Sequence, residues 1–277
     1  MALTVAEVLA RTTTYFTERG FRTARLDAEI LLAHALGIER IVLYTDSERP
    51  LIATELDLAR TLVARRAARE PIAYITGRRG FRRLTLDVSP DVLVPRPETE
   101  HLVEWAIELA SEGAAVLDWG TGSGAVALAV ATERPDLRVT AIDLSTAALA
   151  VARTNDPASR VEFIESDGFS ALTGRRFDLV LANPPYLSDH ELATTAEAEL
   201  SFEPSGALAA GPTGFEAIDR IITAAPSHFS ADGWLVFEVG DSQAGAVVSR
   251  MEREGYRDVS VRRDLSGVER NVAGRAP

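Results

Sequence analysis

The sequence contains no cysteine and no lysine, because all 29 basic residues are arginine. The absence of cysteine excludes disulfides, thiolate zinc sites and cysteine nucleophiles. The absence of lysine excludes a Walker A lysine and any cofactor held by a lysine imine. Only four histidines occur, and no two have the spacing of metal ligands. We therefore expect no metal site, so that carboxylates, amides, hydroxyls, arginines and the backbone must carry any chemistry.

Long apolar stretches are also absent, since no run approaches the ~18 residues of a membrane span. The first residues, Met1–Glu7, lack the basic start and apolar core of a signal peptide. A hydrophobic content of 46% and a charged content of 25% are ordinary for a globular protein, and 277 residues allow one large domain with an appendage or two domains. We expect a cytoplasmic, monomeric protein without membrane partners.

Charge is unevenly distributed along the chain. Residues 1–90 carry 14 arginines and 11 acidic residues, a net charge of +3, whereas residues 91–277 carry 15 and 30, a net charge of −15. Basic groups that neutralise phosphates supply much of the affinity for nucleic acids. The acidic part therefore argues against direct nucleic-acid binding.

Residues 1–70 predict a small helical domain. The pattern indicates helices at Val5–Arg19, Leu26–Leu36 and Glu55–Arg69, and a capping box, Thr4-x-x-Glu7, begins the first of them. Because no catalytic constellation occurs there, we interpret this part as a substrate-docking domain, with a purely structural role as the alternative.

Residues 71–97 predict a β-hairpin linker between two domains. Tyr74–Thr76 and Leu84–Val88 alternate with period two on either side of a glycine-containing segment. The expected tip, residues 78–83, reads Arg-Arg-Gly-Phe-Arg-Arg. Such a tip suits contact with RNA or with an acidic partner, but charge also protects an exposed sheet edge from aggregation.

Residues 98–277 alternate between strand and helix patterns, which is typical of an α/β domain with a mostly parallel, doubly wound sheet. The predicted strands are Ala114–Leu117, Arg138–Ile142, Val161–Ile164, Phe177–Ala182, Trp234–Val239, Asp258–Arg262 and Asn271–Gly274. In open sheets of this kind ligands bind at the carboxyl ends of the strands.

A glycine-rich turn follows the first of these strands and consists of Gly120, Thr121, Gly122, Ser123 and Gly124. Such a turn lets the backbone approach a ligand at a helix N-terminus. Asp143 ends the next strand, where a carboxylate can bind both hydroxyls of a ribose. These features predict a nucleoside site, although they also fit a nicotinamide enzyme or a turn without any ligand.

The third strand ends in a second group of candidate cofactor residues, Asp167, Gly168 and Phe169. Asp167 can accept a hydrogen bond from an adenine amino group, and Phe169 can pack near the ring. An aspartate before a glycine is also a common turn former, so a structural role for Asp167 is the alternative.

The fourth strand leads into Asn183-Pro184-Pro185-Tyr186. Two prolines cannot donate to a sheet ladder, and Pro184 holds Asn183 in an extended conformation. The amide of Asn183, the proline carbonyls and the ring of Tyr186 form a clamp for a planar group with N–H donors. A nucleoside site beside such a clamp is what methyl transfer from S-adenosylmethionine to a planar nitrogen requires, and Asn183 borders both.

The order of these motifs resembles the HemK/PrmC family of class I S-adenosylmethionine-dependent methyltransferases. The resemblance extends over nearly the whole chain. It rests on Glu70–Gly77, Leu93–Glu100, Val116–Gly124, Asn183–Tyr186, Phe202–Pro204, Gly211, Gly214, Glu238–Gly240 and Gln243. Family membership implies methylation of the side-chain nitrogen of the glutamine in the Gly-Gly-Gln motif of class I peptide chain release factors. The chain departs from the family at Gly168, where other members can have a bulky residue beside the adenine.

The resemblance implies a role for each residue of the tetrapeptide. The Asn183 side-chain oxygen and the Pro184 carbonyl would accept the two N–H groups of the substrate amide, while Pro185 and Tyr186 complete the substrate site. No strong general base is evident near the tip. An adenine-N6 methyltransferase acting on RNA or DNA, a non-catalytic cofactor-binding module and a nicotinamide-dependent oxidoreductase remain as alternatives.

Overall fold

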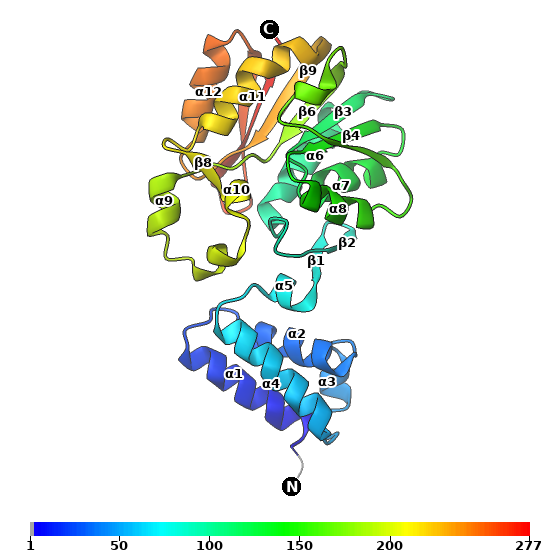
Figure 1. Ribbon diagram of the computed structural model, residues 1–277, viewed down its shortest axis with the longest axis vertical. Helices are drawn as coiled ribbons and strands as arrows, with labels where there is room; N and C mark the ends of the chain where they lie inside the picture. Colours follow the sequence, from blue (N-terminus) through cyan, green and yellow to red (C-terminus); the bar gives the residue numbers. More distant parts are fainter. Residues whose placement is uncertain (1–2) are drawn as a thin grey trace. The chain divides into compact units, whose positions relative to one another are not determined.

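The computed structural model describes residues 3–277, which form two compact units (Figure 1). The first unit consists of the described residues through Gly77 together with Ala198–Phe202, and the second of Arg78–Glu197 and Glu203–Pro277. Each unit has hydrophobic clusters of its own.

The first unit is helical, as the sequence predicts. Its helices are α1 (Val5–Glu18), α2 (Ala24–Leu36), α3 (Val42–Thr45), α4 (Ala53–Ala67), α5 (Ile72–Thr76) and the short 3-10 helix η3 (Ala198–Phe202). The capping box at Thr4 is confirmed, since its side chain accepts from the backbone N–H of Glu7. Arg66 is buried and pairs with Asp27 at 2.8 Å and with Glu199 at 2.8 Å. A buried guanidinium requires such partners, and the second pair ties η3 to the helices.

The hairpin linker differs from the prediction in its first strand. Tyr74–Thr76 is not a strand but part of helix α5, which begins after Pro71 and ends at Gly77 with φ of +73°. Proline is favourable at the start of a helix and a left-handed glycine at its end. The hairpin consists instead of β1 (Arg78–Phe81) and β2 (Leu84–Asp87). Most of the arginine-rich segment is therefore strand, and only Arg82 and Arg83 form the tip.

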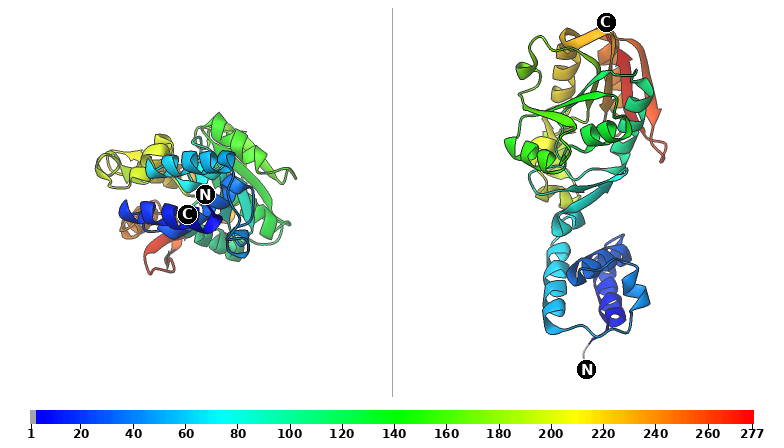
Figure 2. Two further views of the ribbon diagram at one scale, coloured as in Figure 1. Left: turned by 90° about the horizontal axis from the view of Figure 1, so that it is seen from below. Right: turned by 90° about the vertical axis from the view of Figure 1, so that its right-hand side faces the viewer.

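The second unit contains a seven-stranded sheet in the order β10-β11-β9-β6-β3-β4-β5. Its strands are β3 (Ala115–Trp119), β4 (Arg138–Asp143), β5 (Val161–Glu165), β6 (Phe177–Ala182), β9 (Phe229–Glu238), β10 (Arg257–Arg263) and β11 (Glu269–Arg275). The strands β3, β4, β5, β6 and β9 pair with one another in parallel. Strand β11 pairs antiparallel with β9, and β10 pairs antiparallel with β11. The red strands β10 and β11 lie at one edge in the right-hand view of Figure 2. The predicted mostly parallel α/β sheet is confirmed.

Helices cover both faces of this sheet (Figures 1 and 2). Alternate residues of β3 face opposite clusters, with Val116 in one and Leu117 in the other. Helices α6 (Glu100–Leu109) and α7 (Ala125–Glu133) contribute to the first cluster, and α11 (Glu216–Ala224) and α12 (Ala244–Arg253) to the second. The remaining elements are η1 (Pro97–Thr99), α8 (Thr146–Thr154), η2 (Ser170–Leu172), β7 (Leu187–Ser188), α9 (Asp189–Thr194), α10 (Ser205–Leu208), β8 (Ala209–Gly211) and η4 (Ala225–His228). Within residues 3–277, no helix has the length and apolarity needed to span a membrane.

Candidate active site

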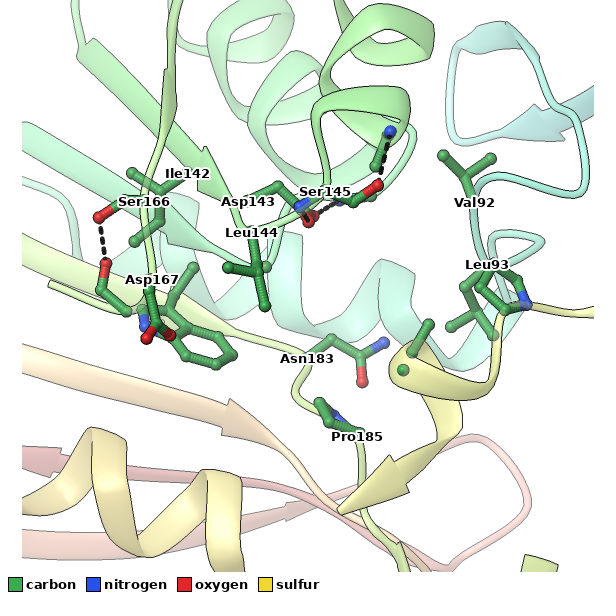
Figure 3. A pocket seen from close by; sticks show the side chains of 18 of the residues that line it. Val92, Leu93, Ile142, Asp143, Leu144, Ser145, Ser166, Asp167, Asn183 and Pro185 are labelled. Carbon is green, nitrogen blue, oxygen red and sulfur yellow. Dashed lines mark hydrogen bonds between the residues drawn. The ribbon is translucent and has the colours of Figure 1, made fainter. Parts of the chain in front are cut away.

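A pocket of about 310 Å³ lies in the second unit at the carboxyl ends of the parallel strands β3 to β6 (Figure 3). Seven of the predicted site residues line it, namely Gly120, Gly122, Asp143, Asp167, Gly168, Asn183 and Pro185. Figure 3 shows Asn183 and Pro185 in the lower part of the view, with Leu93 to the right of Asn183 and Val92 above Leu93. The position agrees with the rule that ligands of open parallel sheets bind beyond the strand ends.

The glycine-rich turn is held against the carboxylate of Asp143. The backbone N–H of Gly122 donates to Asp143 Oδ2 at 2.9 Å, and that of Ser145 donates to Oδ1 at 2.9 Å. Gly122 has φ of +54°, which favours glycine at this point of the turn. Both carboxylate oxygens are thus fixed in place and retain lone pairs for a ligand in the pocket.

Buried residues in and next to the glycine-rich turn hold its backbone in place. Asp118, at the end of β3, is 2% exposed and accepts hydrogen bonds from the Thr121 hydroxyl at 2.6 Å and the Ala127 N–H at 3.2 Å. Burial raises the pKa of Asp118 to about 6, although these hydrogen bonds oppose the shift. Thr121 and Ser123 are buried and, like Gly124, are not part of the pocket lining. Their contribution to the pocket is therefore to shape the backbone.

Asp167 and Gly168 meet an arginine that the sequence does not single out. Arg220, from α11, pairs with Asp167 Oδ1 at 2.7 Å and donates to the Asp167 carbonyl at 3.1 Å. A side chain at Gly168 would meet this guanidinium, because a Cβ there would lie 3.0 Å from Arg220 Nη2. Phe169 lies away from the pocket and stacks on His228 with ring centroids 4.8 Å apart. The flat group next to Gly168 in this chain is thus a guanidinium.

The Asn-Pro-Pro-Tyr tetrapeptide follows β6 directly. The Asn183 side chain donates through Nδ2 to the Thr99 hydroxyl at 3.2 Å, which leaves Oδ1 as the atom available to a ligand. Pro184 is buried, whereas Asn183, Pro185 and Tyr186 are half-buried. The amide of Asn183 is therefore anchored through its nitrogen, a contact that sequence reasoning did not find.

The turn after the tetrapeptide is fixed by residues far along the chain. Gln243 Nε2 donates to the Tyr186 carbonyl at 3.0 Å and to the Gly214 carbonyl at 3.3 Å. A side chain at Gly214 would not fit, since its Cβ would lie 2.7 Å from the Tyr186 carbonyl oxygen. Gln243 and Gly214, both noted in the sequence, thus fix the backbone of Tyr186.

An ion pair between a buried glutamate and a half-buried arginine supports one wall of the pocket. Glu203 is 7% exposed, pairs with Arg96 at 2.5 Å and accepts from the Val94 N–H at 3.3 Å. This pair joins the segment that leads into η1 to the segment that follows the tetrapeptide. Both segments line the pocket, through Leu93 and Pro204. Two stretches noted only for their family resemblance are therefore parts of one wall.

One acidic residue near the tip was missed by sequence reasoning. Glu238 ends β9, the strand beside β6, and lies 4% exposed next to Asn183 and Thr99. The sequence signal was present, because a glutamate within the otherwise apolar run Trp234–Val239 is unusual. The residues that surround Glu238 depend on the order of the strands in the sheet, so the sequence pattern does not reveal them.

Comparisons with known proteins agree with this geometry. Residues 7–77 match the model of the PrmC N-terminal domain, and residues 97–212 match that of the methyltransferase small domain. The release factor glutamine methyltransferase of Burkholderia pseudomallei is 48% identical over 264 residues, which cover 91% of this chain and 92% of the relative. The enzyme of the same name from Geobacter sulfurreducens is 40% identical, with 98% and 96% covered.

The solved structures support the fold. A methyltransferase from Pyrococcus furiosus matches 69% of this chain and 88% of its own, with a TM-score of 0.53 at 18% identity. At that identity the likeness concerns the arrangement of the sheet and helices alone.

Proposed function

The chain belongs to the family of release factor glutamine methyltransferases, and from this membership we propose that it methylates the glutamine of the Gly-Gly-Gln motif in class I peptide chain release factors with S-adenosylmethionine as methyl donor. Members of this family are protein-glutamine N5 methyltransferases. The observation that carries the proposal is the position of Asn183, whose free amide oxygen borders a pocket with nucleoside-binding features.

The residues of the pocket fit S-adenosylmethionine. Asp143 would present two fixed carboxylate oxygens to the hydroxyls of the ribose, and Gly120 and Gly122 would let the backbone approach the cofactor closely. Asp167 would accept from the adenine amino group, and the Arg220 guanidinium would supply a flat face beside the ring. When bound, S-adenosylmethionine supplies a sulfonium methyl group that a nucleophile attacks in line with the departing sulfur.

Asn183 and Pro184 orient the glutamine amide. An amide nitrogen is a poor nucleophile because its lone pair is delocalised into the carbonyl. Asn183 Oδ1 and the Pro184 carbonyl each accept one N–H, so that positive charge developing on the nitrogen is stabilised as the N–C bond forms and the C–S bond breaks. Tyr186 would pack on the amide plane, and the methylated, positively charged nitrogen would then lose one proton to water. Positioning and electrostatics then account for the rate.

The remaining parts of the chain have roles in this proposal. Residues 1–70 are the docking domain for the release factor, residues 71–97 the hairpin linker, and residues 98–277 the methyltransferase domain. Translation takes place in the cytoplasm, which is the location we propose. The net charge of −15 in residues 91–277 favours a protein substrate over a nucleic acid.

The proposal is tested by incubating the enzyme with isotope-labelled S-adenosylmethionine and a recombinant class I release factor. Mass spectrometry should find one added methyl group on the peptide that carries the Gly-Gly-Gln motif. A release factor with glutamate in place of that glutamine is the matched control, and it should remain unlabelled. Label on the control, or transfer to RNA or DNA oligonucleotides instead of the release factor, would contradict the proposal.

A further inference from the structure

Two buried oxygen atoms without partners lie on neighbouring strands directly behind the substrate tetrapeptide. They are Glu238 Oε2 and Asn271 Oδ1, and neither has a hydrogen-bond partner among residues 3–277. The side chains are 4% and 1% exposed, respectively. A buried polar atom without a partner costs about 1–3 kcal/mol, more if it is charged, so a pair of them requires an explanation.

The sheet places these two residues opposite each other. In the antiparallel pairing of β9 with β11, Glu238 is the direct partner of Asn271, so their side chains are on the same face. Asn271 Nδ2 donates to the Phe237 carbonyl at 3.3 Å, which fixes the amide and makes Oδ1 its free end. A carboxylate and an amide oxygen are both acceptors and cannot bond to each other. One proton on Glu238 would supply the donor that both atoms lack.

The parallel pairing of β6 with β9 places Glu238 beside the substrate motif on its other side. Ala182 is opposite Phe237, so the next residues, Asn183 and Glu238, are neighbours at the strand ends. The Thr99 and Asn183 side chains interact with the Glu238 carboxyl group and lower its pKa. The Asn183 amide nitrogen therefore donates to the Thr99 hydroxyl and lies beside Glu238.

Burial favours the neutral form of Glu238, and the surrounding charges act in both directions. Burial raises the pKa of Glu238 to about 7, and the nearby charge of Glu98 adds to the shift, whereas Thr99, Asn183 and the positive charge of Arg270 oppose it. Arg270 also faces Asp264, from which its Nε is 3.5 Å away. Tyr186 is the other titratable group near Glu238, and burial together with the Glu238 charge raises the pKa of its hydroxyl.

We propose that Glu238 is a positioning residue whose protonated carboxyl group donates to Asn271 and accepts from Asn183, so that Asn183 Oδ1 is turned toward the substrate amide. The inference rests on the proposed function, since it assigns the group that orients the Asn183 clamp. Glu238 is not part of the pocket lining formed by the described residues, which separates this role from that of a base acting on the substrate.

Three variants separate the roles of charge and hydrogen bonding. Glu238→Gln keeps the shape, an acceptor for Asn183 and a donor for Asn271. Glu238→Ala removes all of these. We expect Glu238→Ala to lower kcat by roughly 10²-fold, as loss of one oriented group at a preorganised site does, with the affinity for S-adenosylmethionine nearly unchanged. Glu238→Gln should recover most of that loss. A folded Glu238→Gln as slow as Glu238→Ala would overturn the proposal, because the ionised form would then be the active one.

The protonation state can be measured without any substrate. The infrared C=O stretch of protonated Glu238 is obtained as the difference between the wild-type and Glu238→Gln spectra, in which the buried carboxyl of Asp118 cancels. This band should be present at pH 6 and should disappear with a midpoint near pH 7. Asn271→Ala, the third variant, removes the acceptor of the proton and should shift that midpoint to lower pH. Glu252→Gln, at an exposed position on α12, is the matched control and should leave the band unchanged. Absence of this band from the difference spectrum at pH 6 would refute the protonated carboxyl of Glu238.

Stability provides a second readout of the same proton. Because the pKa of Glu238 is higher in the folded than in the unfolded protein, its contribution to the free energy of unfolding is full below about pH 4.5 and is lost as pH rises to about 7. The Tm of Glu238→Gln relative to the wild type should therefore rise between pH 5 and pH 8. A constant difference would contradict the inference. If the wild type failed to methylate the release factor, only the proposed function would fail, since the band and Tm need no substrate.

Discussion

Replacing Asn183 by aspartate should lower kcat, although by less than replacing it by alanine. The two side chains, amide and carboxylate, have the same shape, and the aspartate would still offer oxygen atoms to the substrate amide. It would, however, exchange the Nδ2 donor for an acceptor where the wild type contacts the Thr99 hydroxyl at 3.2 Å and the buried carboxyl of Glu238.

The magnitude follows from those two contacts. Leaving a buried acceptor without its donor costs about 1–3 kcal/mol, which corresponds to a factor of roughly 5 to 150 if it falls entirely on the active orientation. Loss of the oriented oxygen itself, as in Asn183→Ala, costs roughly 10²–10³ in kcat. A second carboxyl beside Glu238 also raises the pKa of the pair, because two neighbouring carboxylates cannot both ionise cheaply.

The assay is the steady-state rate of methyl transfer to the release factor between pH 6 and pH 8, with cofactor affinity measured by calorimetric titration. Asn183→Asp should recover activity relative to the wild type as pH falls, since a protonated aspartate regains a donor and mimics the amide. Cofactor affinity should change little in either variant, because Asp143 and the glycine-rich turn lie on other strands. An Asn183→Asp enzyme with wild-type kcat throughout this range would refute the anchoring of Nδ2.

Three further predictions concern the pocket and the hairpin. Asp143→Ala should weaken S-adenosylmethionine binding by about 1.5–3 kcal/mol in a calorimetric titration, and unchanged affinity would contradict the ribose assignment. Gly168→Ala should displace Arg220 and strain a residue with φ of +58°, lowering both Tm and cofactor affinity, whereas Gly245→Ala, with no neighbour within 4 Å, should lower neither. Arg82→Ser should lower the free energy of unfolding by roughly 1.5–3 kcal/mol, measured by urea titration, because Arg82 pairs with Glu133 and Glu104. Arg83 is exposed, so Arg83→Ser should leave the free energy of unfolding unchanged and raise KM for the release factor. Equal stability of these two hairpin variants would show that the Arg82 pairs contribute nothing.

The hairpin shows where a local pattern was insufficient. Tyr74–Thr76 and Arg78–Phe81 both alternate well enough for a strand, and the hydrophobic pattern favours the first. In the structure Pro71 and Gly77 bound a short helix, so the chain enters its first strand only at Arg78. Pro71 and Gly77 thus decided that Tyr74–Thr76 is helix and not strand. The arginines at 78 and 79 are therefore strand residues, and those at 82 and 83 form the tip.

The sequence by itself determined the parallel sheet, the glycine-rich turn with Asp143, and the Asn-Pro-Pro-Tyr tip. Each of these depends on neighbours along the chain: alternation of apolar residues, glycines where the backbone must turn, prolines where a strand must end. Only the tertiary structure decided what surrounds the tip. Thr99, Glu238 and Asn271 lie 84, 55 and 88 residues from Asn183 in the sequence. Because β9 inserts between β6 and β11, Glu238 lies between Asn183 and Asn271. Strand order is settled by the packing of the whole core, so no local pattern reveals which buried side chains will share a proton.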